Sequence, residues 1–140
     1  MDNNGLVTSI KTPQFFYEIH TSERFQGLCR IIDINLDKSV LVFCRTKKDV
    51  DFITEKLNLL NYKAGGYHGD IGPHARDITL KKFIAKELNI LLVTDIPNKI
   101  TKATQIETVI FSIIPQDPDS YTQRIQRLES SIKINEIDIL

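Results

Sequence analysis

The sequence predicts an α/β domain with a mainly parallel sheet flanked by helices, and two observations support that fold class. Short apolar runs alternate along the chain with segments whose apolar residues recur at helical spacing. The run from Val40 to Cys44 contains only apolar residues, which is typical of a strand buried on both faces. Strands that alternate with helices form right-handed β-α-β units, and such units build parallel sheets.

Six strands are expected, each a short run of β-branched, aromatic or aliphatic residues. The first is rich in aromatic residues, the third contains two consecutive glycines, and the last is the apolar tail of the chain. The expected strands lie at residues 14–20, 39–44, 65–67, 89–95, 107–114 and 132–140.

Four helices are expected between these strands, because helix-start signals precede apolar residues at helical spacing. Ser22 is a candidate N-cap, and Thr46 followed by Asp49 resembles a capping box. Pro73 and Pro118 occupy the first-turn position that proline favours. The side chains expected to face the core are, in chain order, Phe25, Leu28, Cys29, Ile32, Val50, Ile53, Leu57, Leu60, Leu80, Phe83, Ile84, Leu88, Tyr121, Ile125 and Leu128.

The length and the charge balance of the chain limit the classes of function. A chain of 140 residues is long enough for one domain, which we place at residues 14–140 after a flexible lead-in or linker at 1–13. Lys+Arg and Asp+Glu both number 18, so any site for a polyanion must be a local cluster. The two cysteines form no zinc or CxxC pattern, and no apolar run approaches the ~20 residues of a membrane span. We therefore expect a reduced, cytoplasmic protein that does not enter a membrane.

Three polar loops follow predicted strands, and a basic helix comes after them. Each loop is the polar end of a segment that begins as a strand, and these segments are 41–49, 64–70 and 91–95. The basic helix covers 121–130. In an open α/β sheet, ligands bind at the carboxyl ends of the strands. We therefore expect all three loops to meet along one edge of the sheet and to form a binding site there.

Four motifs occur in order along the chain: SVLVFCRTKKDVDFITEKL, GYHGDIGPHARDITLKKF, ILLVTD and IIPQDPDSYTQRIQR. Together they resemble the C-terminal RecA-like domain of DEAD-box ATP-dependent RNA helicases, over residues 14–127. The resemblance implies a three-layer RecA-like fold of the P-loop NTPase type. It also implies two partners, RNA and an N-terminal RecA-like domain that holds ATP and Mg²⁺.

Five residues match positions that the family uses against RNA. Arg45 follows a buried strand, where its guanidinium can clamp a phosphate with two parallel hydrogen bonds. Gly69 allows the main chain to approach a sugar-phosphate, and Asp70 either fixes the loop or accepts from a ribose hydroxyl. Arg76 stands in the first turn of a helix, whose N–H groups also favour a phosphate. Thr94 occupies a strand-end position that touches RNA phosphate in the family.

Two nearby residues have supporting roles in this interpretation, and one position departs from the family pattern. His68 is expected to orient or pack the loop rather than to act as a catalyst. Asp95 matches a family residue that organises the following loop. The family has a glutamine three residues before the helix arginine, and that position is Pro73 in this chain.

The positions that face ATP in the family have changed. Where the family has a glycine and an aspartate that bonds the ribose of ATP, this chain has Ile100 and Lys102, and lysine cannot accept that hydrogen bond. Arg124 and Arg127 match two arginines of the closing motif, one turn apart on one helix face. The family's final arginine, the finger that stabilises the transferred phosphoryl group, is Ser130 here, and such a finger is worth ~10³–10⁵ in rate.

Hydrolysis of ATP is not expected from this chain alone. The chain contains no GxxxxGK(S/T) phosphate cradle and no Asp-Glu-Ala-Asp sequence. Glu129, next to the finger position, is expected to add repulsion toward a triphosphate. ATP and Mg²⁺ therefore enter only if an N-terminal RecA-like domain supplies those groups. The function implied by the resemblance is the RNA-contacting C-terminal half of a helicase.

Two alternatives remain open at this point. The changes at 97–102 and 128–130 also fit a degenerate pseudo-helicase module that binds a protein partner without RNA or ATP activity. Cys44 is a candidate nucleophile, because cysteine phosphatases and sulfurtransferases place a cysteine after a strand. However, the phosphatase pattern requires arginine where this chain has Val50, and the sulfurtransferase loop requires glycine where it has Lys47.

Overall fold

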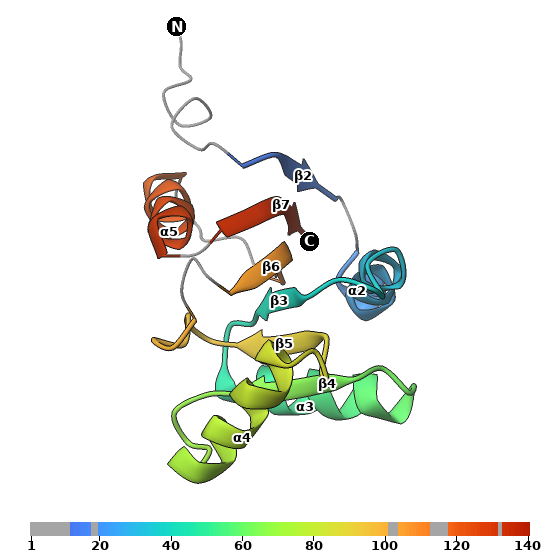
Figure 1. The fold of residues 1–140 in the computed structure, drawn as a ribbon. Helices are drawn as coiled ribbons and strands as arrows, with labels where there is room; N and C mark the ends of the chain where they lie inside the picture. The colour runs from blue at the N-terminus through green and yellow to red at the C-terminus, as the bar shows by residue number, and fades with distance from the viewer. Residues whose placement is uncertain (1–11, 18–19, 101–103, 113–117, 132) are drawn as a thin grey trace, which may run out of the picture.

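The computed structural model of the chain describes residues 12–17, 20–100, 104–112, 118–131 and 133–140. The elements are, in chain order, β2 (Gln14–Phe16), a 3-10 helix (Thr21–Glu23), α2 (Arg24–Asp33), β3 (Val40–Phe43), α3 (Lys47–Leu59), β4 (Ala64–Tyr67), α4 (Pro73–Ile84), β5 (Ile90–Val93), β6 (Gln105–Phe111), α5 (Pro118–Ser131) and β7 (Lys133–Ile139). Within the described ranges, six parallel strands form one sheet in the order β2-β7-β6-β3-β5-β4 (Figure 1). The predicted α/β class and the parallel sheet are confirmed.

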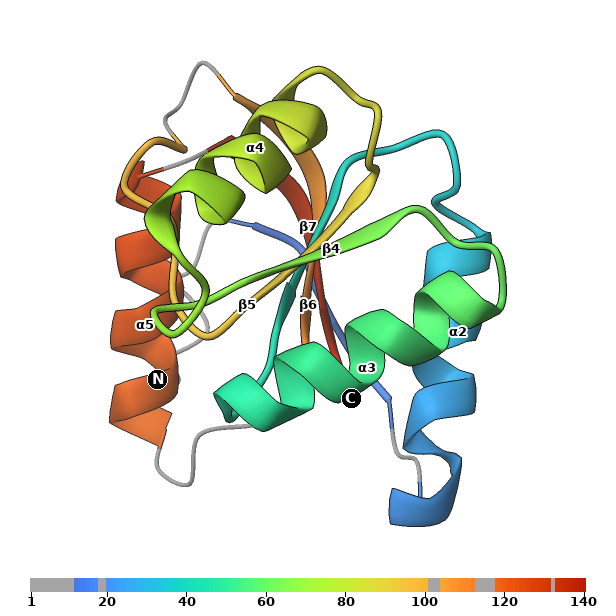
Figure 2. The same ribbon diagram turned by 90° about the horizontal axis from the view of Figure 1, so that it is seen from below.

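Helices cover both faces of the sheet and make the domain three-layered, with α2 and α3 on one face and α4 and α5 on the other (Figure 2). Successive residues of β3 point to opposite faces. Leu41 and Phe43 pack in the core under α4 and α5, whereas Val40 and Val42 pack in the core under α2 and α3. All four side chains are at most 3% exposed, as expected for the central strand of a parallel sheet.

Three of the predicted helix starts are confirmed and one is wrong. The Thr46 hydroxyl accepts a hydrogen bond from the Asp49 N–H at 3.0 Å and caps α3 as predicted. Pro73 and Pro118 are the first residues of α4 and α5. Ser22 does not cap α2, because it lies inside the 3-10 helix that precedes α2, and α2 has no side-chain cap. The chain thus enters α2 through a tighter helical turn instead of the extended backbone of an N-cap.

The predictions fail mainly where elements end. The strand expected over 14–20 is β2, which stops at Phe16. Leu60 and Ile84 were expected in the core but are 56% and 48% exposed, because Leu60 follows the last residue of α3 and Ile84 is the last residue of α4. The structure does not describe residues 1–11, 18–19, 101–103, 113–117 and 132, or the side chain of Tyr121, so the predictions for Lys102 and for the Tyr121 side chain lie outside the described residues.

Two consecutive glycines in β4 let helices pack closely on both faces of this edge strand. A Cβ atom at Gly65 would lie 2.6 Å from Cγ2 of Thr79 on α4 and 2.7 Å from Cδ1 of Leu88. A Cβ atom at Gly66 would lie 3.0 Å from Cγ1 of Val50 on α3. Ordinary side chains do not approach so closely, so the absence of a Cβ allows the close packing of α3 and α4 against β4.

One carboxyl group of β7 is buried in the sheet. Asp138 has no exposed surface, and its Oδ1 accepts a hydrogen bond from the Tyr17 hydroxyl at 3.0 Å. Its Oδ2 has no hydrogen-bond partner among the described residues. Burial, and then the neighbouring Glu136 carboxyl, raise the pKa of Asp138 to about 7. Asp138 therefore keeps its proton far above the pH at which an ordinary aspartate loses it.

We expect Gly65→Ala to destabilise the domain by about 1–3 kcal/mol, because the added methyl group overpacks the contact with α4. Gly69→Ala is the matched control, since a Cβ atom there would meet only the end of the Lys47 side chain, at 3.8 Å or more. The control should leave the free energy of unfolding within a few tenths of a kcal/mol. Urea denaturation of both variants measures the difference, and equal losses would contradict the packing argument.

We expect Asp138→Asn to become more stable than the natural chain as the pH rises from 4 to 8. The folded-state pKa of Asp138 lies above that of an unfolded aspartate, near 3.9. The stabilisation from the bound proton is therefore complete below about pH 4 and is lost as the pH rises through 7, at up to ~1.4 kcal/mol per pH unit. Asparagine carries no such charge. Urea denaturation at several pH values measures the difference in free energy, and a difference that does not change with pH would refute this assignment.

Candidate nucleic-acid interface

The loops at the carboxyl ends of β3, β4 and β5 lie along one edge of the sheet, as predicted. Lys47, at the start of α3, pairs with Asp70 after β4, with Nζ and Oδ1 3.0 Å apart. Lys99, in the loop after β5, pairs with Asp77 of α4 at 2.8 Å. The hydrogen bonds from Lys47 and Lys99 hold the pKa of the two carboxyls below the usual range. Such exposed pairs contribute little to stability. They link the start of α3 to the loop after β4, and the loop after β5 to α4.

His68 organises the loop after β4 from the inside. Its side chain is buried, and its Nε2 lies 2.8 Å from Oδ1 of Asp51 on α3. The Asp70 N–H donates to Nδ1 of the same ring at 3.2 Å. Nδ1 must therefore be unprotonated, so Nε2 carries the proton and donates to Asp51. The prediction that His68 orients this loop is confirmed, and it leaves Gly69 exposed at the turn.

Arg76 and Thr94 stand at the same edge, one in the first turns of α4 and one just after β5. The Arg76 guanidinium lies 5.9 Å from the centre of the Tyr67 ring, which orients it by a cation–π contact. Its Nε is buried and has no hydrogen-bond partner among the described residues. The side chain of Thr94 is half-buried. The position of Arg76 near the N-terminus of α4 adds main-chain N–H groups to its own positive charge.

Arg45 lies at the end of β3 and lines a pocket of about 640 Å³ between α2 and α3, here called the basic pocket. The charged residues of this pocket are three cations, Arg24, Arg45 and Lys56, and one carboxylate, Asp49. Arg45 is exposed, as the prediction of a residue at the edge of the sheet requires. The basic pocket is thus a local cluster of positive charge in a chain whose net charge is +0.

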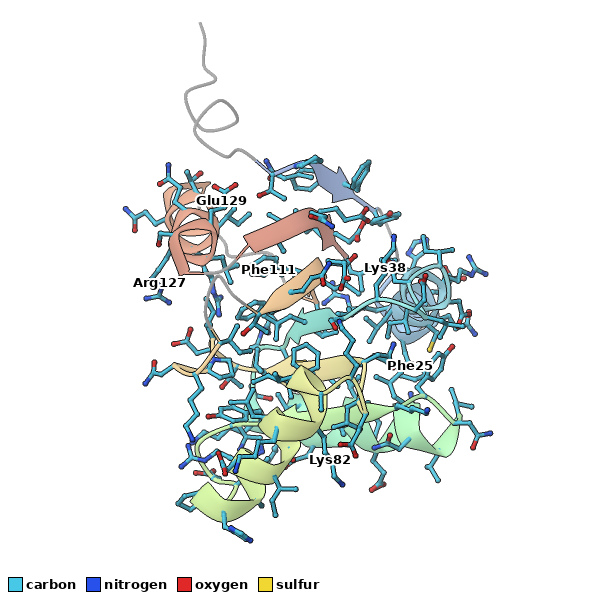
Figure 3. The ribbon with its side chains drawn as sticks, viewed as in Figure 1. Phe25, Lys38, Lys82, Phe111, Arg127 and Glu129 are labelled. Atoms are coloured by element: carbon cyan, nitrogen blue, oxygen red, sulfur yellow. The ribbon has the colours of Figure 1, made fainter. Side chains whose placement is uncertain are left out.

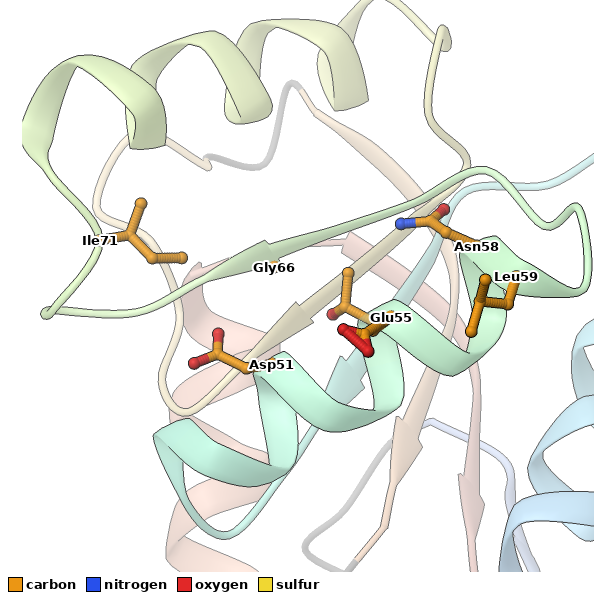
Figure 4. A pocket seen from close by; sticks show the side chains of 7 residues that line it. Asp51, Glu55, Asn58, Leu59, Gly66 and Ile71 are labelled. Carbon is orange, nitrogen blue, oxygen red and sulfur yellow. The ribbon is translucent and has the colours of Figure 1, made fainter.

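A second hollow, of about 480 Å³, lies between α3 and the edge strand β4 (Figure 4). Asp51, Glu55 and Asn58 project into it from α3. The side-chain amide of Asn58 bonds both main-chain groups of Ala64, at 3.0 and 3.1 Å. The charged residues of this hollow are both acidic, so a polyanion is repelled here.

The two arginines of α5 face the loop after β5, on one side of the helix as predicted. Nη2 of Arg124 donates to the Thr94 carbonyl at 3.3 Å. The Arg124 guanidinium also lies 5.6 Å from the centre of the Phe43 ring and 5.9 Å from that of Phe111. These two rings stack on each other with their centres 5.0 Å apart, at the ends of β3 and β6. Arg124 therefore makes structural contacts within its own domain that the sequence does not predict.

Arg127 reaches the loop after β5 one helical turn later. Its Nη2 lies 3.4 Å from Oδ1 of Asp95, and both side chains are largely exposed. The same Asp95 oxygen accepts a hydrogen bond from the Ile96 N–H at 2.8 Å. The prediction that Asp95 organises the following loop is thereby confirmed.

Ser130 and Glu129 form hydrogen bonds within the domain. The Ser130 hydroxyl donates to the Arg127 carbonyl at 2.8 Å, inside α5. Glu129 leaves α5 in a different direction from Arg127 (Figure 3). Its Oε2 accepts from both the N–H and the hydroxyl of Thr12, at 2.8 and 2.6 Å. Glu129 is thus engaged with Thr12, and its expected repulsion toward a triphosphate stays a prediction.

Ser130 and Ile100 stand at two positions that the resemblance assigns to ATP. Ser130 lacks the guanidinium of the finger arginine, and its hydroxyl is bonded within the helix. Ile100, where the family has a glycine, is 3% exposed and belongs to the core under α4 and α5.

Cys44 is not an activated nucleophile. Its side chain is 3% exposed, and burial, followed by the nearby Asp49, raises the pKa of its thiol to about 12. A nucleophilic cysteine needs a lowered pKa, so the cysteine-enzyme alternative is contradicted. Within the described ranges, no group of three or more His, Cys, Asp or Glu side chains is placed to hold a metal ion. No helix in the described ranges is long and apolar enough to cross a membrane.

Sequence reasoning missed the contribution of α2 to this edge. Nη1 of Arg24 donates to the Ser112 carbonyl at the end of β6, at 2.9 Å. The Lys56 ammonium lies 4.0 Å from the centre of the Phe25 ring, which belongs to α2. Phe52 was the sequence signal that could have pointed to this cluster. It is an aromatic residue on the polar side of its helix, and Lys56, four positions later, is its neighbour on the same helix face.

A parallel sheet covered by helices on both faces is the architecture of doubly wound α/β domains, which bind ligands at the carboxyl ends of their strands. Residues 23–129 match the family described as the helicase conserved C-terminal domain. The chain belongs to this family, and it is similar to DEAD-box RNA helicases.

Two curated relatives, 35% and 39% identical to this chain, are named as RNA helicases. The DEAD-box ATP-dependent RNA helicase CshA of Bacillus licheniformis is 39% identical over 121 residues, which cover 86% of this chain and 25% of the relative. The ATP-dependent RNA helicase CshA of Listeria monocytogenes is 35% identical over 121 residues, covering 86% of this chain and 23% of the relative. The chain thus spans about a quarter of the length of the curated relatives that it matches.

Solved structures show the same fold. A DEAD box protein from the hyperthermophile Methanococcus jannaschii superposes with a TM-score of 0.74 at 32% identity, over 92% of this chain and 36% of that chain. The C-terminal domain of Dbp5 from S. cerevisiae, in a complex with Gle1, superposes with a TM-score of 0.72 at 21% identity, over 93% of this chain and 76% of that chain. The predicted three-layer RecA-like fold is confirmed.

Arg124→Ala is expected to lower the free energy of unfolding by about 1–2 kcal/mol, because it removes two ring contacts and the hydrogen bond to Thr94. Arg127→Ala is the matched control on the same helix face, since its exposed ion pair contributes ~0–1 kcal/mol. Urea denaturation of the two variants gives the comparison. A loss for Arg124→Ala no larger than that for Arg127→Ala would show that Arg124 has no structural role.

Proposed function

We propose that this chain is the C-terminal half of a DEAD-box RNA helicase that contacts the sugar-phosphate backbone of RNA and docks on an N-terminal ATPase domain. The observation that carries this proposal is Arg76, whose guanidinium is oriented by Tyr67 at the edge of the sheet with a buried, unpartnered Nε. Membership of the helicase C-terminal family supports it, as do relatives that are themselves RNA helicases. The proposed RNA-contacting residues are Arg45, Gly69, Asp70, Arg76 and Thr94.

The chemistry of this edge suits phosphates rather than bases. Arg76 offers a planar guanidinium beside the N-terminal N–H groups of α4, and the exposed Gly69 lets the main chain approach a sugar. Lys47 partly neutralises the negative charge of Asp70, so this carboxylate repels RNA less than an unpaired carboxylate would. Contacts with phosphate and sugar carry no base code, so the proposed binding tolerates any RNA sequence.

In this proposal ATP and Mg²⁺ are held by the N-terminal domain, which supplies the phosphate cradle and the metal carboxylates. Of the two arginines of α5, Arg124 is engaged with Thr94 and two rings, whereas the side chain of Arg127 is 65% exposed. Arg127 is therefore the residue of this chain that is best placed to reach the domain interface. The expected site of action is the cytoplasm.

We expect Arg76→Gln to weaken binding of a single-stranded oligouridylate by about tenfold or more, because it removes a charged hydrogen bond to phosphate. It should also reduce the slope of log K against log salt by ~0.7, the value for one phosphate contact on a single strand. Arg30→Gln, an exposed arginine on the outer side of α2, is the matched control and should change neither quantity. Fluorescence anisotropy at several salt concentrations, starting from low salt, measures both.

Two results would count against the proposal. One is the absence of RNA binding by the natural chain at low salt, and the other is an equal salt slope for Arg76→Gln and Arg30→Gln. Either result would favour the pseudo-helicase module. Nuclease-resistant co-purification with a protein partner is the further test of that alternative.

A further inference from the structure

We propose that the basic pocket between α2 and α3 extends the RNA contact of Arg45 into a nucleotide-binding site, which takes the phosphate on Arg24 and Arg45 and the base against Phe52. The inference rests on the proposed RNA contact and extends it to the opposite face of the sheet, away from Arg124 and Arg127. The ligand is a nucleotide unit, supplied either by an RNA strand or as a free mononucleotide.

The pocket is built by elements that are distant in sequence. Arg24 and Phe25 come from α2, Arg45 follows β3, and Phe52 and Lys56 come from α3. Figure 3 shows Phe25 on α2, on the side of the domain away from Arg127. The pocket therefore opens at the carboxyl end of β3, where open α/β sheets bind ligands. Its volume of about 640 Å³ falls in the range of small-molecule sites.

The charges in the pocket favour an anion. Three cations face one carboxylate, Asp49. Nε of Arg24 is buried without a hydrogen-bond partner among the described residues, while its Nη1 is held by the Ser112 carbonyl. Arg45 is exposed, and no described residue pairs with it. Guanidinium groups bind phosphate in a planar, two-bond geometry, so two of them at one pocket fit a phosphate well.

The apolar part of the pocket favours a flat ring. The Lys56 ammonium lies between the aromatic side chains, 4.0 Å from the centre of the Phe25 ring and 5.1 Å from that of Phe52. The Phe52 side chain is nevertheless 62% exposed, so part of its ring remains accessible to a ligand. Aromatic rings beside cations are the combination that binds single-stranded nucleic acid, because bases stack on the ring while the cations contact phosphate. An acidic peptide would use the cations and leave the ring without a stacking partner.

The basic pocket is continuous with the proposed RNA-contacting edge. Arg45 lies two residues before Lys47, whose ammonium is bonded to Asp70 in the loop after β4. An RNA strand on that loop thus passes the start of α3, next to Arg45. The basic pocket then holds one nucleotide of the same strand, next to the nucleotides that contact Gly69, Arg76 and Thr94.

The test compares Phe52→Ala with Phe16→Ala, using an oligouridylate and UMP as probes. Both phenylalanines are 62% exposed, and Phe16 lies in β2 at the opposite edge of the sheet, so it is the matched control. We expect Phe52→Ala to weaken binding of the oligouridylate about 5- to 100-fold, the range for loss of one base stack. Phe16→Ala should leave it unchanged. Thermal melts check that both variants remain folded.

Amide NMR spectra of the natural chain distinguish a free mononucleotide from one unit of an RNA strand as the ligand of the pocket. Shifts of the Phe25, Phe52 and Lys56 amides with UMP alone identify a free mononucleotide site. Shifts of these amides only with the oligouridylate identify a site for one unit of an RNA strand. Either pattern, with the loss in Phe52→Ala, supports the proposal.

Two outcomes overturn it. If Phe52→Ala binds RNA as the natural chain does while Arg76→Gln is weakened, the basic pocket is not a nucleotide site and the proposed function stands. If polyglutamate shifts the pocket amides and neither nucleotide probe does, the pocket is a site for acidic peptide. Failure of Arg76→Gln to affect RNA binding is a separate result, which counts against the proposed function itself.

Discussion

The rest of the structure depends on the complete burial of β3 at the centre of the parallel sheet. Its residues alternate between two cores, so α2 and α3 must cover one face and α4 and α5 the other. Its carboxyl end also places the site. Phe43 lies under Arg124 on one face, and Arg45, two residues later, reaches the basic pocket on the other. One apolar strand therefore positions both groups of cations on opposite sides of the same edge.

These two groups of cations differ in how far their charges are already engaged. Arg124 is bonded to a main-chain carbonyl and lies against two rings, and Arg127 is paired with Asp95. On the other face, Arg24 retains a buried Nε without a partner among the described residues. A ligand gains most where a cation has no competing partner, because no existing contact is lost on binding. Under the two proposals, Arg24 and Arg76 therefore bind the anion, while the arginines of α5 keep their contacts within the domain.

The sequence predicts those features of the fold and site that arise from local patterns. The buried run at β3, the Thr46 cap and the proline at the start of α4 each depend on a few adjacent residues, and each is confirmed. Ser22 fails as a cap because the preceding backbone is a 3-10 turn, which the cap pattern does not specify. Contacts between distant segments, such as Lys99 with Asp77, depend on how loops approach each other in the folded chain. Spacing along one sequence contains no such information, so the partners of the site residues could not be predicted.

We infer from the contacts of α5 that an arginine at position 130 would not by itself restore the ATP contacts that the resemblance implies. An arginine at position 130 would supply the missing guanidinium, but Glu129 beside it is tied to Thr12 by two hydrogen bonds. Ile100 belongs to the core under the same helix, so a glycine there would open a cavity beneath α4 and α5. Arg124 also contributes to the structure through Phe43 and Phe111. The end of α5 thus acts mainly in packing and in anchoring the N-terminal segment. Under the proposed function, this domain then contributes RNA affinity, while control by ATP must come from the N-terminal domain.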